Sequence, residues 1–221
     1  MNQPAHAAFL LEQCWHTVPG GTAVAAVGLA AALADLPDVT VTGIAARHAR
    51  PPADGPMPPV PVVHSRLPRP ALYEAWHRLN RPRVENMGAD PGGDPGFSIV
   101  HASGGAVPAT RLPLVATIHD LGWRHEPGHA TRRGRRLFEA WLADARRADH
   151  VTCPSEATRS DLLAAGFEPD RVSVIPLGAD PVAVDPGAAA ALRSHYGIDG
   201  PFVLWVGTTE PRKNLVRLVS A

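Results

Sequence analysis

Lysine, cysteine and net charge are all scarce in this sequence, and the lack of net charge excludes one class of protein. The 221 residues include 21 basic and 21 acidic side chains, and Lys213 is the single lysine among the basic ones. A chain without net charge is not a general binder of nucleic acids or other polyanions. The two cysteines, Cys14 and Cys153, lie far apart without C-x-x-C spacing. This usage is typical of a reduced cytosolic protein with buried, apolar thiols.

Long hydrophobic runs are also missing, and no secretory signal is expected. The longest apolar stretch, residues 24–36, is interrupted by Gly28 and is shorter than the roughly 20 residues that a membrane-spanning helix needs. The first residues lack the basic region of a secretory signal. Hydrophobic residues nevertheless make up 45% of the chain, which is enough for a substantial core. We therefore expect a folded cytoplasmic protein.

What the sequence does contain is an alternation of short apolar runs and helical patterns, typical of an α/β protein with a doubly wound parallel sheet. The strands are expected at residues 7–13, 39–44, 98–101, 114–118, 150–153 and 172–175. The helices are expected from a cap at Thr22 to residue 36, and at 70–85, 132–147 and 156–165. Six prolines between residues 51 and 61 predict an extended surface loop. Ser155 and Gly166 are expected to cap the two ends of the helix between them.

The pattern changes in the last fifth of the chain. We expect a first Rossmann-like domain over residues 1–178 and a linker with a short Ala-rich helix over 179–200. A new strand is predicted at 201–207 and a helix near Lys213, which indicates the start of a second domain of which only the opening is present. Because a β-α unit without its own core buries little surface, residues after 200 should be less protected from hydrogen exchange than the first sheet.

Three candidate sites follow predicted strands, where ligands of open parallel sheets bind. Residues 19–22 contain a Gly-Gly turn before a helix, where a backbone can approach an anion, although a plain tight turn gives the same pattern. Residues 117–120 place His119 directly after a strand. Its ring either forms a hydrogen bond with a substrate hydroxyl or has all its hydrogen-bond partners within the fold. Residues 207–215 form the third site. The sequence has no G-x-G-x-x-G, P-loop or Asp-x-Asp motif, and no metal site is expected.

The third site carries the lone lysine. Arg212 and Lys213 stand at the start of a predicted helix, where cations oppose the helix dipole unless an anion lies between them and the free N–H groups. Lysine is a compact, mobile charge and arginine a rigid fork, so a phosphate site that needs lysine does not tolerate replacement by arginine. The sequence therefore predicts that this segment binds phosphate.

Five motifs, taken in order, resemble those of family 4 glycosyltransferases. They are Gly20-Gly21-Thr22, Thr-Ile-His-Asp-Leu at 117–121, Pro-Ser-Glu-Ala-Thr-Arg at 154–159, Val-Ile-Pro-Leu-Gly-Ala-Asp at 174–180 and Gly-Thr-Thr-Glu-Pro-Arg-Lys-Asn at 207–214. The resemblance is close from about residue 97 onward. It implies a GT-B fold of two Rossmann-like domains and metal-independent transfer of a hexose, with retention, from a nucleotide-diphosphate sugar. The acceptor would be a glycan or a lipid-linked molecule, and no cofactor is implied.

The resemblance also implies roles for individual residues. Gly20, Gly21 and Thr22 would face the donor diphosphate, and His119 would contact the transferred sugar near the reaction centre. The same resemblance implies that Arg212 and Lys213 hold the diphosphate and stabilise its developing charge, with Glu210 orienting these cations.

The departures from the family pattern leave two other interpretations open. The Glu-x7-Glu segment that holds the donor sugar in the family is absent from these 221 residues, and Thr208 stands where many relatives have arginine. The chain would then be a non-catalytic module that binds the acceptor or a partner, as a fragment of a truncated or split glycosyltransferase. A GT-B sugar-nucleotide epimerase shares the fold but fits the motif at 207–214 less well.

Residues 131–147 combine six arginines with two acidic residues and an apolar stripe. One interpretation is an amphipathic helix that contacts an anionic membrane, placing the protein on the inner membrane face. The other is a surface helix whose apolar stripe packs on the sheet, and we favour this second interpretation.

Overall fold

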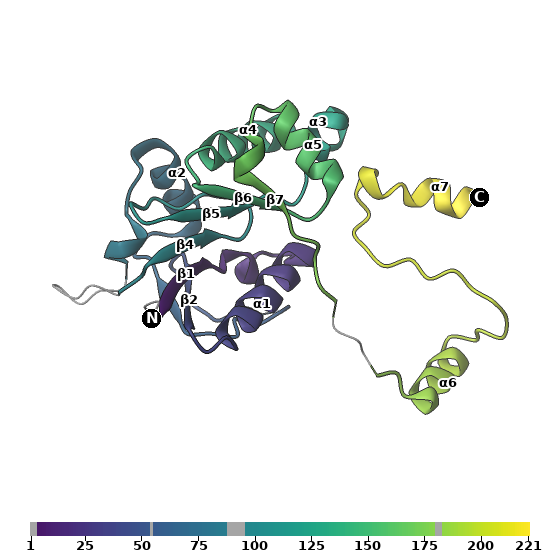
Figure 1. The fold of residues 1–221 in the computed structure, drawn as a ribbon. Helices are drawn as coiled ribbons and strands as arrows, with labels where there is room; N and C mark the ends of the chain where they lie inside the picture. Colours follow the sequence, from purple (N-terminus) through teal and green to yellow (C-terminus); the bar gives the residue numbers. More distant parts are fainter. Residues whose placement is uncertain (1–3, 54, 88–95, 180–182) are drawn as a thin grey trace.

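The computed structural model describes residues 4–53, 55–87, 96–179 and 183–221 (Figure 1). Seven parallel strands form one sheet in the order β3-β2-β1-β4-β5-β6-β7. They are β1 (Ala5–Leu10), β2 (Val39–Ala45), β3 (Val62–His64), β4 (Ile99–Ala102), β5 (Leu114–Thr117), β6 (His150–Cys153) and β7 (Val172–Val174). The predicted Rossmann-like, doubly wound parallel sheet is confirmed.

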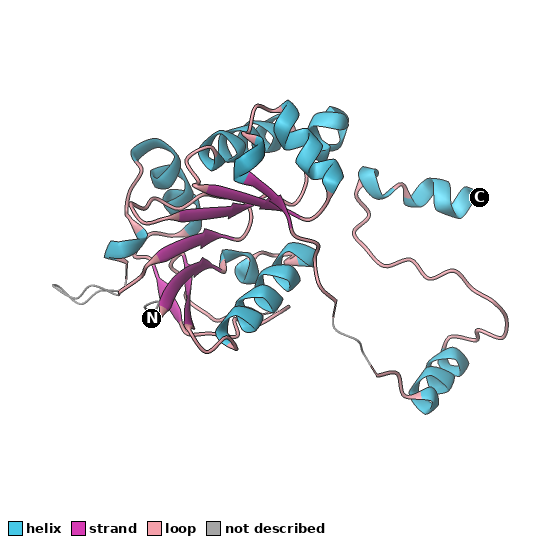
Figure 2. Cartoon of the chain, viewed as in Figure 1, coloured by secondary structure: helices cyan, strands magenta, loops and turns pink. Residues whose placement is uncertain are grey.

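Helices connect these strands and continue beyond the last of them (Figure 2). The α-helices are α1 (Gly20–Ala34), α2 (Arg69–Leu79), α3 (Gly122–His125), α4 (Arg132–Ala145), α5 (Glu156–Ala164), α6 (Pro186–His195) and α7 (Leu215–Ser220). Short 3₁₀ turns are η1 (Glu12–Trp15), η2 (Val84–Asn86), η3 (Pro127–His129), η4 (Pro169–Arg171) and η5 (Pro211–Lys213). Of the described helices, none is both long and apolar enough to cross a membrane.

The sheet lies between two unequal layers of helix. Helix α1 covers one face near β1 and β2, whereas α2, α4 and α5 lie over the other face (Figure 1). Right-handed crossovers explain this, because the chain moves one way across the sheet from β1 to β2 and the opposite way from β3 to β7. Two apolar clusters result, one around Phe9, Ala26 and Val41 under α1 and a larger one that includes Trp76 and Leu162.

The first strand is shorter than predicted because a buried carboxylate turns the chain. Glu12 is fully buried, and its Oε2 accepts a hydrogen bond from the Ala46 backbone N–H at 2.7 Å. Its Oε1 lies 2.9 Å from His48 Nε2 and 3.9 Å from Arg69 Nη1. These contacts bind η1 to the end of β2. The predicted strand 7–13 therefore ends at Leu10.

Strand β3 is missing from the prediction, which assigned the region to an extended loop. It pairs with β2 through Gly43 and Val62. A Cβ at Gly43 would lie 2.9 Å from side-chain atoms of both Leu11 and Val62, so glycine is what allows this close packing.

The predicted caps of the helix after β6 are confirmed. The Ser155 hydroxyl accepts a hydrogen bond from the Thr158 backbone N–H at 3.2 Å, and Gly166 has a φ of +84° just beyond the helix. The predicted cap at Thr22 is wrong. Helix α1 begins two residues earlier, at Gly20, whose φ of +61° a side chain would disfavour.

Both cysteines are buried and unpaired, as expected. Burial raises the pKa of the Cys14 thiol to about 11, so it stays protonated at neutral pH. Burial likewise raises the pKa of Cys153. Both thiols therefore act as small apolar groups in the core.

The strand predicted at 201–207 does not form. Residues 183–221 include α6, η5 and α7 but no strand, and in Figure 1 α6 and α7 lie away from the sheet. Val203 and Val206 are 81% and 86% exposed. A strand needs a neighbour to accept and donate its backbone hydrogen bonds, and the described part of the chain supplies none here. The Ala-rich helix predicted in the linker is confirmed as α6, whereas the domain boundaries stay a prediction and residues 180–182 lie outside the described residues.

Candidate functional site

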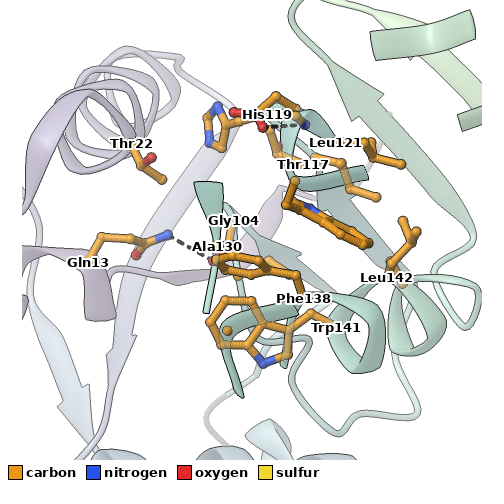
Figure 3. A pocket seen from close by; sticks show the side chains of 18 of the residues that line it. Gln13, Thr22, Gly104, Thr117, His119, Leu121, Ala130, Phe138, Trp141 and Leu142 are labelled. Carbon is orange, nitrogen blue, oxygen red and sulfur yellow. Dashed lines mark hydrogen bonds between the residues drawn. The ribbon is translucent and has the colours of Figure 1, made fainter. Parts of the chain in front are cut away.

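A large cavity lies where the strand order reverses. Strand β1 pairs with β2 on one side and with β4 on the other. The chain therefore runs outward from β1 to β2 and later returns to the opposite side of β1 at β4. Open α/β sheets bind ligands at this switch point, outside the carboxyl ends of the strands. A cavity of about 940 Å³ lies there, lined by Gln13 after β1, Gly104 after β4 and His119 after β5 (Figure 3).

Gln13 is held in one orientation at the wall of this cavity. The side chain is 3% exposed, and its Nε2 donates to Ser103 Oγ at 3.0 Å and to the Gly104 carbonyl at 3.2 Å. The Ser103 hydroxyl donates to the Leu10 carbonyl, so it can only accept from Gln13. This arrangement fixes which end of the amide is nitrogen. Gln13 Oε1 is buried and has no hydrogen-bond partner in the described structure.

His119 is fixed by contacts at both its ring and its backbone. Its Nε2 lies 3.1 Å from the Ser103 carbonyl, which can only accept, so Nε2 carries the proton and Nδ1 is the acceptor of the neutral ring. Its carbonyl accepts from the Thr158 hydroxyl at 3.2 Å. Behind it, burial and the nearby His119 together lower the pKa of His101 to about 4. The histidine pair therefore presents a neutral His101 beneath the cavity-lining His119.

Gly104 allows three elements to converge. Its φ is +137°, and a Cβ there would lie 3.1 Å from His119 Cδ2 and 3.2 Å from Thr22 Cγ2. The end of β4 can therefore pass between the start of α1 and the end of β5. The sequence analysis did not single out this residue, although the Gly104-Gly105 pair, shortly after the strand predicted at 98–101, was the available signal.

The predicted glycine turn contributes to the site through its last residue. Thr22 lines the cavity, and Gly20 and Gly21 precede it in the first turn of α1. A Cβ at either glycine would meet nothing within 4 Å, so space beside this turn is open. The geometry is compatible with a ligand that approaches the backbone closely.

The motif at 207–214 reaches the cavity at Glu210. This side chain lines it, and the Glu210 carbonyl accepts from the Lys213 N–H at 2.9 Å within the η5 turn. Lys213 is exposed and is not among the lining residues. Arg212 belongs to the same turn by its backbone, while its side chain lies outside the described residues. The structure thus brings together Thr22, His119 and Glu210.

Four aromatic side chains from α2, α3 and α4 also line the cavity, and the sequence analysis missed them as site residues. The rings of Tyr73 and Trp141 lie 5.8 Å apart between centroids, those of Phe138 and Trp141 also 5.8 Å, and those of Trp123 and Phe138 5.9 Å. Leu142, one position along α4 from Trp141, belongs to the main core. Most of the apolar stripe of this helix therefore packs within the fold, as the favoured interpretation stated, whereas Leu137 is 42% exposed.

The charged groups around the cavity are acidic or titratable. Among the described lining residues the carboxylates are Asp120, Glu126 and Glu210, the histidines are His16, His119 and His125, and there is no arginine or lysine. Burial lowers the pKa of His16, with a further contribution from the charge on Arg69. At neutral pH the described lining thus carries negative formal charge.

The fold is of the GT-B type, and the chain belongs to Glycosyltransferase Family 4, whose model matches residues 19–183. It is 34% identical over 110 residues to the D-inositol 3-phosphate glycosyltransferase of Acidothermus cellulolyticus. That match covers 46% of this chain and 24% of the relative.

Solved structures agree on the fold. Crystal structures of Anabaena HepE, one with UDP and glucose and another with UDP-glucose, match with a TM-score of 0.50 and 18% identity. Each match covers 87% of this chain and 50% of HepE. The chain thus spans about a quarter of the curated relative and half of the solved one. The resemblance to the family is confirmed.

Proposed function

We propose that the chain contributes to the transfer of a hexose from a nucleotide-diphosphate sugar to an acceptor, with retention and without a metal ion. The observation that carries the proposal is the cavity at the switch point of a family 4 chain, lined by Thr22, His119 and Glu210. Both HepE structures contain UDP with glucose or UDP-glucose, which supports a donor of this class. Among the described residues no group of three or more His, Cys, Asp or Glu side chains is arranged to hold a metal ion.

In this proposal the donor diphosphate lies between the start of α1 and the 210–213 turn. The N–H groups of the first turn of α1, beside Gly20 and Gly21, face the phosphates, and Arg212 and Lys213 neutralise the charge that develops as the glycosidic bond breaks. Glu210 orients these cations. His119, with Nδ1 free to accept, contacts a hydroxyl of the transferred sugar.

The test compares two variants that each remove one nearby positive charge. Lys213→Ala should weaken the affinity of the chain for UDP-glucose about tenfold or more, because a charge-assisted phosphate contact is lost. Arg217→Ala, in exposed α7, is the matched control and should change the affinity less than about twofold. Calorimetric titration measures both. Equal affinities for Lys213→Ala and the unchanged chain would refute the assignment of Lys213.

A second variant tests the sugar contact. His119→Asn keeps a polar side chain but removes the ring, and we expect hexose transfer to fall by about two orders of magnitude while UDP affinity stays within about twofold. Transfer to acceptor is followed by UDP release. Loss of UDP affinity in this variant would mean that His119 supports the diphosphate region instead.

A non-catalytic module that binds only the acceptor is the second candidate function. The positions of the cavity-lining residues favour it, because all of those described except Glu210 lie within residues 13–145, in the predicted first domain. Such a module would bind acceptor analogues but show no calorimetric response to UDP-glucose.

We also propose that the exposed arginines of α4 contact an anionic membrane surface. Arg132, Arg133 and Arg136 of α4 are exposed, whereas Arg146 donates to the Gly166 carbonyl at 2.9 Å and is engaged within the fold. Because Phe138 and Leu142 face the cavity and core and Leu137 is the exposed apolar residue of the stripe, we expect the attraction to anionic lipid to be mainly electrostatic. Co-sedimentation with vesicles containing phosphatidylserine should then vanish at high salt.

A further inference from the structure

We infer that Arg69 is a positioning residue for the candidate site: oriented by Glu12, it holds the segment between η1 and α1 against the cavity. Four residues of that segment line the cavity, namely His16, Val18, Pro19 and Thr22. The inference rests on the proposed function, because it identifies what positions the turn that would face the donor diphosphate. Three features carry it: the contacts of Arg69, the burial of Glu12 and the state of the His16 ring.

Arg69 connects two elements that are far apart in the sequence. It is the first residue of α2, and its Nη1 donates to the carbonyl of Trp15, the last residue of η1, at 3.4 Å. The last carbonyls of a helical turn have no partner within the turn, and a cationic side chain can satisfy them. The next residue, His16, leaves the turn in an extended conformation, with a φ of −71° and a ψ of 148°. Arg69 therefore contacts the backbone at the point where the chain leaves η1 for the cavity.

Glu12 orients Arg69. Its carboxylate is fully buried, with Oε1 3.9 Å from Arg69 Nη1 and 2.9 Å from His48 Nε2, and with Oε2 2.7 Å from the backbone nitrogen of Ala46. A buried carboxylate is costly unless opposite charge and hydrogen-bond donors surround it. Because Ala46 and His48 follow β2, the carboxylate joins η1 to the sheet as well as to α2. The same nitrogen of Arg69 thus contacts a buried charge and the Trp15 carbonyl, which favours one conformation of its side chain.

The ring of His16 responds to the same arginine. Burial, and secondly the charge of Arg69, lower its pKa, whereas the charge of Glu12 raises it and that of His48 lowers it. Such an effect weakens with distance, so the guanidinium lies close to the ring as well as to the backbone that carries it. At neutral pH His16 is therefore uncharged and presents to the cavity a ring that can accept as well as donate a hydrogen bond.

The first test measures the His16 ring itself. Long-range ¹H–¹⁵N NMR during a pH titration of the full chain follows the histidine rings, and His16→Gln assigns the signals of His16. Arg69→Met keeps an apolar stem but removes the charge, so the pKa of His16 should rise, whereas Arg69→Lys keeps the charge and should leave it nearly unchanged. Arg66→Met is the matched control, because Arg66 is exposed and its charge is not among those that act on His16. The same His16 pKa in Arg69→Met and the unchanged chain would overturn the inference.

The second test measures the affinity for UDP-glucose by calorimetry. Arg69→Met should weaken binding about tenfold, because a segment that is no longer held must be ordered when the ligand binds. Arg69→Lys, which can still reach the Trp15 carbonyl, should recover most of that loss, and Arg66→Met should stay within about twofold of the unchanged chain. If the unchanged chain and Arg69→Met bind UDP-glucose equally well, Arg69 does not position the site.

A double-mutant cycle tests whether Glu12 acts through Arg69. Glu12→Gln keeps the shape of the side chain and an oxygen that can accept from Ala46, but it removes the charge that orients Arg69. It should weaken UDP-glucose binding, and its combination with Arg69→Met should bind within about twofold of the weaker single variant, because the two residues act as one unit. Fully additive losses would overturn the part assigned to Glu12. Should Glu12→Gln not fold, the two Arg69 variants still decide the inference.

Failure of this inference is distinguishable from failure of the proposed function. A chain that does not bind UDP-glucose, but whose His16 pKa rises in Arg69→Met, supports the positioning role and refutes the donor assignment. A chain whose UDP-glucose affinity depends on Lys213 but not on Arg69 overturns the positioning role and leaves hexose transfer supported.

Discussion

His101 is a histidine that the fold keeps neutral. It lies on β4 with Nε2 2.8 Å from Thr117 Oγ1, and its ring centroid is 4.7 Å from that of Phe9. Burial, and secondly the charge of His119, lower its pKa from 6.5 to about 4. As the pH falls below 6.5, the unfolded chain gains a proton at this position that the folded chain takes up only near pH 4. Stability is therefore lost between these two values.

Replacing His101 by Gln should remove this part of the pH dependence. Between pH 7.5 and pH 5 the unchanged chain should lose about 2 kcal/mol more of its free energy of unfolding than His101→Gln does. Urea unfolding followed by circular dichroism at the two pH values measures the difference. Equal losses in the two proteins would show that His101 titrates normally in the folded state.

Gly104 should tolerate no side chain. Gly104→Ala places a Cβ against His119 and Thr22 and requires a φ of +137°, so we expect a loss of about 1–3 kcal/mol in the free energy of unfolding. Gly178→Ala is the control, because nothing lies within 4 Å of a Cβ there. It should leave stability within about 0.5 kcal/mol. Similar melting temperatures for the two variants would contradict the close approach at Gly104.

At the scale of single elements, the Ser155 cap offers the sharpest test. Its hydroxyl satisfies one of the free N–H groups at the start of α5, so Ser155→Ala should cost about 1 kcal/mol. Ser155→Asp restores an acceptor and should recover most of that loss. Thermal unfolding of the three proteins decides the point, and an Ala variant as stable as the parent would exclude a capping role.

The elements that sequence reasoning found are those whose own residues determine them. Strands β2, β4 and β6 and helices α4 and α5 each carry a local apolar pattern, and their predicted positions are confirmed. Strand β3 was missed because its three residues follow a proline-rich segment and depend on pairing with Gly43 of β2. The strand predicted at 201–207 has the right pattern but no partner. Patterns within a segment do not reveal whether a neighbouring strand is present.

The site was predictable to a similar extent. His119 and Thr22 lie at the cavity because the ends of parallel strands meet there, which sequence order already implied. Gln13 was assigned to the end of a strand, and Phe138 and Trp141 to the packing stripe of a helix. Their part in the cavity depends on how η1 and α4 sit against the sheet ends. That arrangement is tertiary, and no spacing in the sequence encodes it.

At the scale of the whole molecule, stability should be uneven. Strands β2, β1, β4, β5 and β6 each have a hydrogen-bonded neighbour on both sides, whereas residues 201–210 form no strand. We expect backbone amides of residues 201–221 to exchange within seconds while those of β1, β4 and β5 are protected for far longer, since local opening costs little where few groups are buried. Hydrogen–deuterium exchange with peptide resolution measures this. Equal protection in both regions would contradict it.

The segment with Val203, Leu204 and Val206 also affects how the protein behaves in solution. Its three apolar side chains are 74–86% exposed, and its extended backbone is unpaired. Exposed segments of this composition can pair with one another across molecules, as the unprotected edge of a sheet does. Colloidal stability of the isolated chain should therefore decline as its concentration rises, through contacts that involve neither the cavity nor its ligands.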